Sequence, residues 1–322
     1  MNKHFRSIYA DHLLQYIRMK QQFGFSYQTG AVILAQLDRL AAERNEKSIG
    51  ITQGFALAWG QRRTHESERS RYDRIGHLIR FSCYLTDLGI DSYVPRSPSY
   101  PQNTCIPYIY SSVEIEALCE ACDQLRLNEL QPNSSLISMP ALIRLLYGTG
   151  LRIGEALKLT DQDVNLAESY LRVKDSKNDQ ERLIPLSTSL VSVCKEYVAY
   201  RDRLPLEQPA TCFFVKLNGR PCTSISVRSW FKRCLHQVGI PATARLHDLR
   251  HTFAVHSLAT MAEAGVDLYV SLPILSRYLG HQSLESTNHY VRLTASSYPG
   301  LIQQIDMICL DVFPKTHRYE AH

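Results

Sequence analysis

Apolar and polar positions follow the period of a helix over residues 1–95. Within residues 31–42, apolar side chains recur every three or four positions, which predicts a helix with one buried face. A second apolar face runs through residues 75–85, with arginines before and along it. These are Arg62, Arg63, Arg69, Arg71, Arg74 and Arg80. Such a surface is either solvated or used to bind phosphates, and we take all six as candidate phosphate-binding residues.

Residues 96–107 break the helical pattern. Four prolines stand between positions 95 and 107. Proline restrains its own φ and disfavours helix in the residue before it, so this stretch predicts an extended linker. A chain of 322 residues also fits two domains of roughly 150 residues each. We therefore expect a helical domain over 1–95, a Pro-rich linker over 96–107 and a second domain over 108–322.

The second domain begins with two predicted helices. Ser111 and Glu114 have the spacing of a capping box, which predicts a helix that runs to about Leu125. Pro140 predicts the start of the next helix, because proline is favoured in the first turn. Glycines at 148 and 150 are expected to end it.

Short strands follow these helices. The runs YLRVKD and ERLIPL predict two strands joined by a polar turn, and the Asn-Gly of FFVKLNGRP predicts another turn between extended segments. Helical patterns dominate from Ser224 onward. The expected fold class is mainly α with a small β-sheet, in two domains.

Positive charge is concentrated in the first domain. Residues 1–96 hold 14 Lys and Arg against 9 Asp and Glu, whereas residues 97–322 hold 22 of each. An excess in one part is expected if that part binds a polyanion. A net charge of +5 is also common among proteins that bind no nucleic acid, so charge alone decides nothing.

Cysteine usage and hydropathy indicate the compartment. The nine cysteines are scattered, which is typical of reduced thiols in a cytoplasm. Cys119 and Cys122 form a CxxC without a second Cys/His pair for zinc, so we expect them in an apolar core. The N-terminus has no apolar run suited to a signal peptide, and no stretch approaches a membrane span. We expect a soluble cytoplasmic protein with no membrane partner.

Five short motifs follow one another along the second domain. They are GTGLRIGEALKL at 148–159, SKNDQERLIPL at 176–186, HDLRHTF at 247–253, LGH at 279–281 and NHYV at 288–291. In this order the chain resembles the tyrosine recombinases, the family of phage integrases and Xer-like site-specific recombinases, some of them transposon-encoded. The resemblance covers about residues 106–291. It implies a core-binding (SAM-like) DNA-binding domain over 1–95 and an α+β catalytic domain over 108–322.

The resemblance implies that a side chain cleaves DNA. Displacement at phosphorus spreads negative charge over the non-bridging oxygens, and the planar fork of arginine suits that charge. Arg152 and Arg250 match the family's two phosphate-binding arginines. Tyr290 matches the nucleophile, which forms a 3′-phosphotyrosyl link and frees a 5′-hydroxyl. Because a free phenol has a pKa of about 10, a base or a positive field must help it.

Three more residues match positions that handle protons. Lys177 matches the general-acid lysine of the family's β-hairpin, and Lys174 is the alternative because a turn register is hard to fix from sequence. His247 matches a residue proposed as general base or phosphate donor. His281 matches a second donor to the transition state. Taken singly, such side chains are more often structural, and Arg152 in particular could pair with an acidic neighbour; their joint order favours catalysis.

The resulting interpretation is site-specific recombination. We expect double-stranded DNA with specific recombination sites as the partner, and a homo-tetramer on DNA that exchanges strands through a Holliday junction, with a monomer as one option for the free protein. The sequence has no phosphate-binding loop and no metal-ligand cluster, so we expect no cofactor. Two alternatives stay open: a type IB topoisomerase-like enzyme, and a catalytically inactive DNA-binding or architectural protein. The target sequence, any accessory proteins and the role of the C-terminal segment are not indicated.

Overall fold

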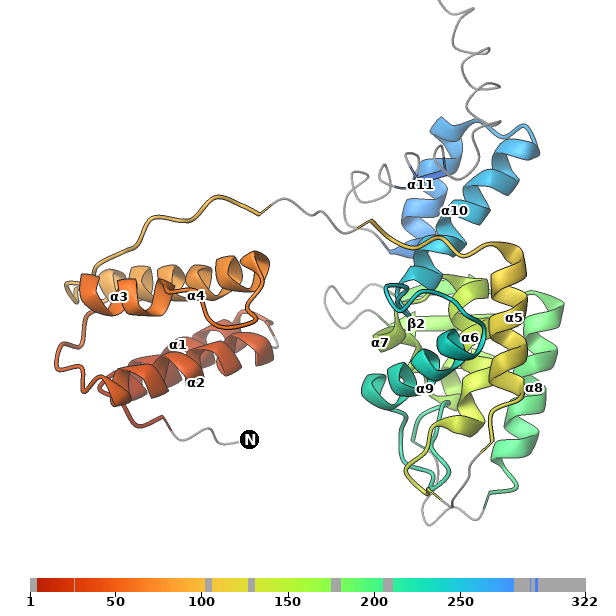
Figure 1. Ribbon diagram of the computed structural model, residues 1–322, viewed down its shortest axis with the longest axis horizontal. Coiled ribbons are helices and arrows are strands. Elements are labelled where there is room, and N and C mark those ends of the chain that lie inside the picture. The colour runs from red at the N-terminus through yellow and green to blue at the C-terminus, as the bar shows by residue number, and fades with distance from the viewer. Residues whose placement is uncertain are drawn as a thin grey trace, which may run out of the picture. The chain divides into compact units, whose positions relative to one another are not determined.

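Two units, Met1–Cys105 and Ile106–His322, make up the computed structural model of the chain (Figure 1). The structure describes residues 5–25, 27–101, 106–126, 131–174, 181–204, 211–280, 290, 293 and 294. The architecture is mainly α-helical with one small sheet, as the sequence predicts. No helix in these ranges combines the length and the apolar character needed to cross a membrane.

The first unit is built from helices. They are α1 (Ala10–Gln22), α2 (Gln28–Glu43), α3 (Gln53–Gly60) and α4 (Glu68–Asp87). The helix expected over 31–42 is confirmed within α2, whose Leu34 and Leu37 are fully buried. Helix α4 packs on α1, α2 and α3, and its Phe81 lies 5.7 Å from the ring of Tyr16. These apolar faces form the core of the unit.

Residues 96–101 and 106–107 of the proline-rich stretch form neither helix nor strand, and part of this stretch rests on the first unit. The backbone N–H of Tyr93 donates to the carbonyl of Ile51 at 2.8 Å. Farther along, the ring of Tyr100 lies 5.2 Å from that of Tyr72 on α4. The guanidinium of Arg69 stacks on Tyr100 at 4.6 Å. Residues up to Tyr100 are therefore attached to the helical unit.

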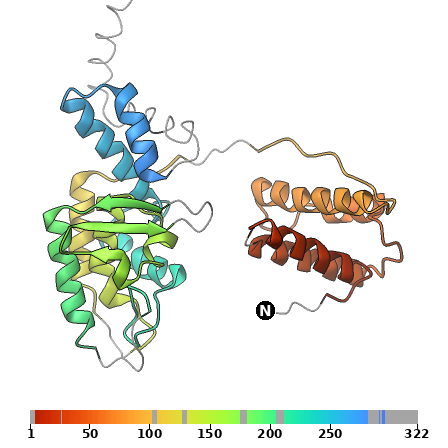
Figure 2. The same ribbon diagram turned by 180° about the vertical axis from the view of Figure 1, so that it is seen from behind.

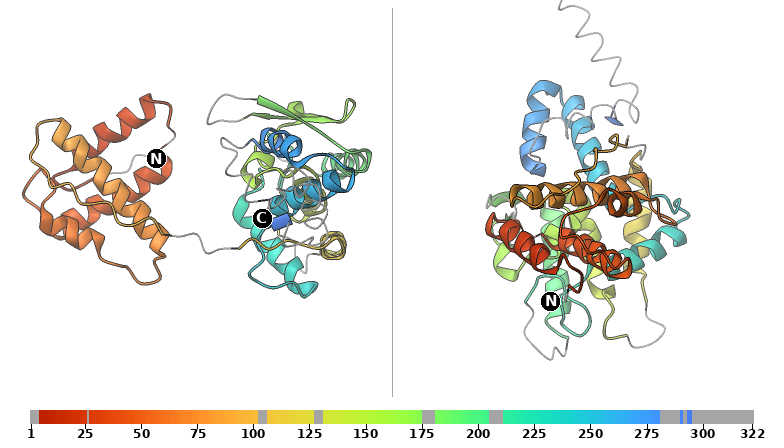
Figure 3. Two further views of the ribbon diagram at one scale, coloured as in Figure 1. Left: turned by 90° about the horizontal axis from the view of Figure 1, so that it is seen from above. Right: turned by 90° about the vertical axis from the view of Figure 1, so that its left-hand side faces the viewer.

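The second unit surrounds one buried helix. Its helices are α5 (Ser112–Asp123), α6 (Met139–Thr149), α7 (Ile153–Ala156), α8 (Thr188–Arg201), α9 (Ser224–Gln237), α10 (Asp248–Glu263) and α11 (Leu268–Leu279), with short 3-10 turns at Leu136–Ser138 and Asp161–Asp163. Helix α6 is largely apolar, with Arg144 on its one partly exposed side, and it contacts α5, α8, α9 and α10. A helix with this composition is expected at the centre of a core. Helices α10 and α11 lie side by side in both views of Figure 3 and contact each other.

The ends of α5 and α6 agree with the sequence prediction except at Gly148. The capping box at Ser111 and Glu114 is confirmed at the start of α5. Pro140 lies in the first turn of α6, as predicted. Gly148 does not end that helix, because α6 continues to Thr149. Gly150 ends it in the left-handed region, with a φ of 61°.

The sheet has the order β1-β2-β3 and is antiparallel. Strands β2 (Tyr170–Lys174) and β3 (Glu181–Pro185) confirm the two predicted runs, whereas the two-residue β1 (Val164–Asn165) was not predicted. Leu171, Val173 and Ile184 are buried on one face of the sheet. Figure 2 shows the sheet on one side of the second unit, with helices behind it.

Cys119 and Cys122 contribute to the core of the second unit, as expected. The sulfur of Cys122 lies 3.6 Å from that of Cys234 on α9. Within the described ranges, no group of three or more His, Cys, Asp and Glu side chains is arranged to hold a metal ion.

Candidate active site

The turn between α6 and α7 positions Arg152. Glu155 accepts a hydrogen bond from the backbone N–H of Arg152 at 3.0 Å and another from its Nη1 at 2.9 Å. The acidic neighbour considered from sequence is therefore a real partner. The Arg152 side chain nevertheless stays 42% exposed. It can reach an anion outside the protein while one nitrogen is held.

Arg250 lies on the first turn of α10 and is 2% exposed. Its Nη1 donates to the carbonyl of Gly150 and its Nη2 to the carbonyl of Leu279, both at 2.7 Å. Burial, and then the charge of Arg152, lower the pKa of Arg250 to about 10. Among the described residues no carboxylate forms an ion pair with it. A buried cation without a carboxylate is costly, and a bound anion would offset that cost.

Tyr290 lies within reach of this cation. The side chain is 3% exposed and packs among residues of α10 and α11. Burial raises the pKa of Tyr290, whereas the charge of Arg250, a hydrogen bond from it and the charge of Arg152 act in the opposite direction. The ring thus packs in a mainly apolar cluster, and the hydroxyl lies within hydrogen-bonding reach of Arg250.

Two histidines connect Tyr290 to the start of α10. The His251 ring lies 5.6 Å from that of Tyr290 and 4.9 Å from that of His247. Desolvation lowers the pKa of His247, and the charges of Arg250 and Arg152 act in the same direction. Part of the His247 side chain is nevertheless exposed. A neutral imidazole can accept a proton, although the ring in contact with Tyr290 is that of His251 and His247 contacts His251. The structure therefore brings together Arg152, His247, Arg250 and Tyr290.

The remaining sequence-predicted site residues have different outcomes. Lys177 and His281 lie outside the described residues. The alternative lysine, Lys174, stands at the end of β2, and its Nζ lies 2.7 Å from Oδ1 of Asp163. Its ammonium is therefore already paired in this structure.

The arginines of the first unit do not form one group. Arg62, Arg63, Arg69 and Arg80 are exposed and Arg71 is half-buried. Arg74 is 3% exposed and pairs with Glu66 at 2.7 Å. It also donates to the carbonyls of Trp59 and Gln61. Its expected role as a phosphate-binding residue is wrong, because its donors join α3 to α4 instead.

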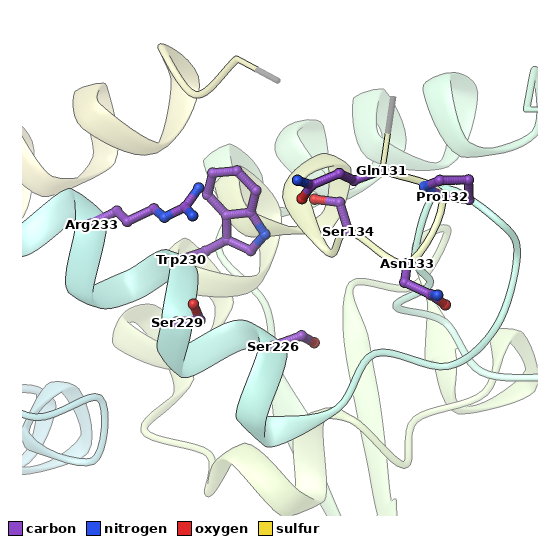
Figure 4. A pocket seen from close by; sticks show the side chains of 8 residues that line it. All are labelled: Gln131, Pro132, Asn133, Ser134, Ser226, Ser229, Trp230 and Arg233. Atoms are coloured by element: carbon purple, nitrogen blue, oxygen red, sulfur yellow. The ribbon is translucent and has the colours of Figure 1, made fainter. Parts of the chain in front are cut away.

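A cationic surface on α9 was missed at the sequence level. Arg228, Lys232 and Arg233 are exposed, and the helix has no acidic residue. We call these three residues the α9 basic face. Arg233 stacks on Trp230 at 4.5 Å, beside an open cavity of about 450 Å³ that hydroxyl and amide side chains line (Figure 4). The sequence could have indicated this surface, because the 14 residues of α9 include no Asp or Glu. The overall charge of residues 97–322 is balanced, so a charge count over the whole domain does not show it.

Comparisons with known proteins find similar sequences and folds. Residues 110–297 match the model of the phage integrase family. A provisionally named integrase/recombinase of Sinorhizobium fredii is 28% identical over 293 residues, covering 88% of this chain and 93% of that protein. Tyrosine recombinase XerC of Chlamydia caviae is 28% identical over 234 residues, covering 71% of this chain and 69% of XerC. The Tn1549 transposon integrase, solved with transposon right end DNA, shares the fold with a TM-score of 0.61 at 18% identity, covering 91% of this chain and all of that one.

Proposed function

Because the chain belongs to the phage integrase family of tyrosine recombinases, we propose that it cleaves and rejoins double-stranded DNA at specific sites with Tyr290 as nucleophile. The observation that carries the proposal is the pairing of the buried Arg250, which forms no ion pair with a carboxylate of the described residues, with the hydroxyl of Tyr290. A phosphodiester is the anion that such a site would accept. Arg152, partly exposed beside it, supplies a second cation for the same phosphate.

The proposed reaction is an in-line displacement. The phenolic oxygen of Tyr290 attacks phosphorus, and the bond from phosphorus to the 5′-oxygen breaks. The phenolic proton passes to a base, for which His247 is the candidate, and the departing 5′-oxygen takes a proton from a general acid, for which Lys177 is the candidate. Arg152 and Arg250 stabilise the charge on the non-bridging oxygens. A 5′-hydroxyl of another strand then reverses the displacement, so the ester conserves the energy of the broken bond.

The assembly is part of the proposal. Strand exchange between two duplexes requires four nucleophiles, so we expect four copies on DNA and a Holliday junction between the two exchanges. Residues 1–95 would act as the core-binding domain and 108–322 as the catalytic domain. The exposed arginines of the first unit and the α9 basic face are the candidate phosphate contacts, and we expect the activity in the cytoplasm.

A nicked suicide substrate tests the nucleophile. Such DNA loses its short 5′-hydroxyl strand after cleavage, so the covalent adduct accumulates. We expect an adduct with the wild-type protein and none with Tyr290→Phe. Tyr278→Phe is the matched control, since Tyr278 is another tyrosine beside the same apolar cluster, and its ring stacks on that of Phe253 at 5.6 Å.

The outcomes separate the candidate functions. An adduct in Tyr290→Phe would refute the assigned nucleophile. DNA binding without an adduct on a cognate site would support the architectural protein. Relaxation of supercoiled plasmid by a monomer, without exchange between two marked duplexes, would support the topoisomerase-like enzyme.

A further inference from the structure

An arginine occupies the buried face of the sheet. Arg182 stands two residues before Ile184 on β3 and opposite Val173 of β2, so its side chain lies on the same face of the sheet as theirs, the face that packs on the core. Only 15% of its side chain is exposed. A guanidinium on such a face requires a charged partner, since burial of an unpaired cation is unfavourable.

The partner is the carboxylate that also holds Arg152. Nη2 of Arg182 lies 2.8 Å from Oε2 of Glu155, while Nη1 of Arg152 lies 2.9 Å from Oε1. Burial acts to raise the pKa of Glu155, but hydrogen bonds from the Arg152 backbone and from Arg182 hold it below its ordinary value. One ionised carboxylate is thus shared by two guanidinium groups.

The charge count of this triad explains what Arg182 does. With Glu155 alone, Arg152 would form a neutral pair, and the carboxylate would compete with a phosphate for it. With Arg182 added, the triad keeps a net charge of +1. Among the described residues, Nε and Nη2 of Arg152 have no acceptor, so these nitrogens stay available.

A second contact places Arg182 at the end of α11. A Cβ built on Gly280 would lie 3.0 Å from Nη1 of Arg182 and 3.2 Å from its Cζ. The preceding residue, Leu279, supplies a carbonyl to Arg250. The Arg182 guanidinium therefore lies where β3, α7 and the end of α11 meet. Its own Nε is buried and finds no acceptor within the described ranges.

We propose that Arg182 is a positioning residue for DNA cleavage: by sharing Glu155, it keeps the fork of Arg152 directed at the scissile phosphate. The inference rests on the proposed function. It assigns no contact with DNA to Arg182, since the side chain faces the core. Loss of Arg182 would leave Glu155 to Arg152 alone and withdraw nitrogens from the phosphate.

Single-turnover cleavage of the suicide substrate at saturating DNA tests this role. We expect Arg182→Gln to lower the rate constant about 10- to 100-fold, the value of one hydrogen bond to a charged group. DNA affinity and the fraction of protein that reacts are expected to stay within about twofold, whereas a merely structural role would reduce the reacting fraction. Arg182→Lys should recover part of the rate. Arg172→Gln on β2, an exposed arginine of the same sheet, is the matched control and should leave the rate unchanged.

A chemical readout keeps the inference separate from the proposed activity. p-Hydroxyphenylglyoxal modifies arginine, and mass spectrometry can follow Arg152 alone. We expect its modification to slow severalfold in Arg182→Gln and to accelerate in Glu155→Gln, and the double variant to cleave no more slowly than the worse single variant. An unchanged Arg152 reactivity together with an unchanged rate constant would overturn the inference. If the wild type forms no adduct, the proposed function fails while the modification pattern still decides whether Arg182 controls Arg152.

Discussion

Gly150 should be irreplaceable, because two independent effects oppose a side chain there. Its φ is +61°, where a Cβ costs about 1–2 kcal/mol. That Cβ would lie 2.4 Å from the ring of Phe253 and 3.0 Å from Leu279. Phe253 cannot easily move, since its ring stacks on that of Tyr278. Overpacking adds about 1–3 kcal/mol, so Gly150→Ala should lose about 2–5 kcal/mol.

Hydrogen exchange followed by mass spectrometry measures this loss in each unit separately. We expect amides of α6 and α10 to lose about 2–5 kcal/mol of protection, while α4 of the first unit serves as an unchanged internal reference. Cleavage should also slow, because the Gly150 carbonyl binds Arg250.

Gly154→Ala is the control for this substitution. A Cβ at Gly154 meets nothing within 4 Å, and the residue lies in α7, so alanine should be neutral or stabilising by up to about 1 kcal/mol. Equal protection of α6 in Gly150→Ala and Gly154→Ala would refute the steric argument.

Four further predictions concern other parts of the molecule. Arg74→Met should destabilise the first unit by about 3–5 kcal/mol at neutral pH, since a buried Glu66 loses its partner. Hydrogen exchange in α4 checks this, with Arg80→Met, an exposed arginine of the same helix, as the neutral control. The pKa of Glu66 is lowered chiefly by its hydrogen bond from Arg74, so the stability due to the pair should be lost as pH falls below the ordinary value of about 4.3. Because the pKa of His247 is lowered, the cleavage rate should stay constant down to about pH 6.5 and fall only at lower pH. A cleavage rate that already falls as the pH drops to about 7, and that does so in the wild type but not in His247→Asn, would contradict this. Replacing the α9 basic face with glutamine should reduce the slope of log affinity against log salt by up to about 2.7, and an unchanged slope would place DNA elsewhere.

Local signals in the sequence predicted the elements well. The capping box of α5, the proline at the start of α6 and the alternation of β2 and β3 act within a few residues, so they can be read without a partner. Gly148 misled because a glycine inside a buried helix is tolerated when packing stabilises the helix. The two-residue β1 has no periodicity to detect.

Long-range pairing set the limit of prediction. Arg74 fits the exposed pattern of arginines along α4, but Glu66 lies before the helix and brings the guanidinium inside. Glu155 and Arg182 are 27 residues apart, and only the fold shows that one carboxylate serves two arginines. The proximity of Arg250 and Tyr290 followed from motif order and family resemblance; spacing alone would not have indicated it.

The two backbone carbonyls that accept hydrogen bonds from Arg250 have a practical consequence for experiments. Gly150 and Leu279 stand at the ends of α6 and α11. A side chain at position 250 that is shorter, or that has a single donor group, would lose at least one of these two hydrogen bonds as well as its contact with the phosphate. Folding and turnover are therefore inseparable at this position, and an inactive variant made there is a poor tool for trapping intact complexes on DNA. Removing the hydroxyl of Tyr290 changes one oxygen atom and leaves those helix ends tied together.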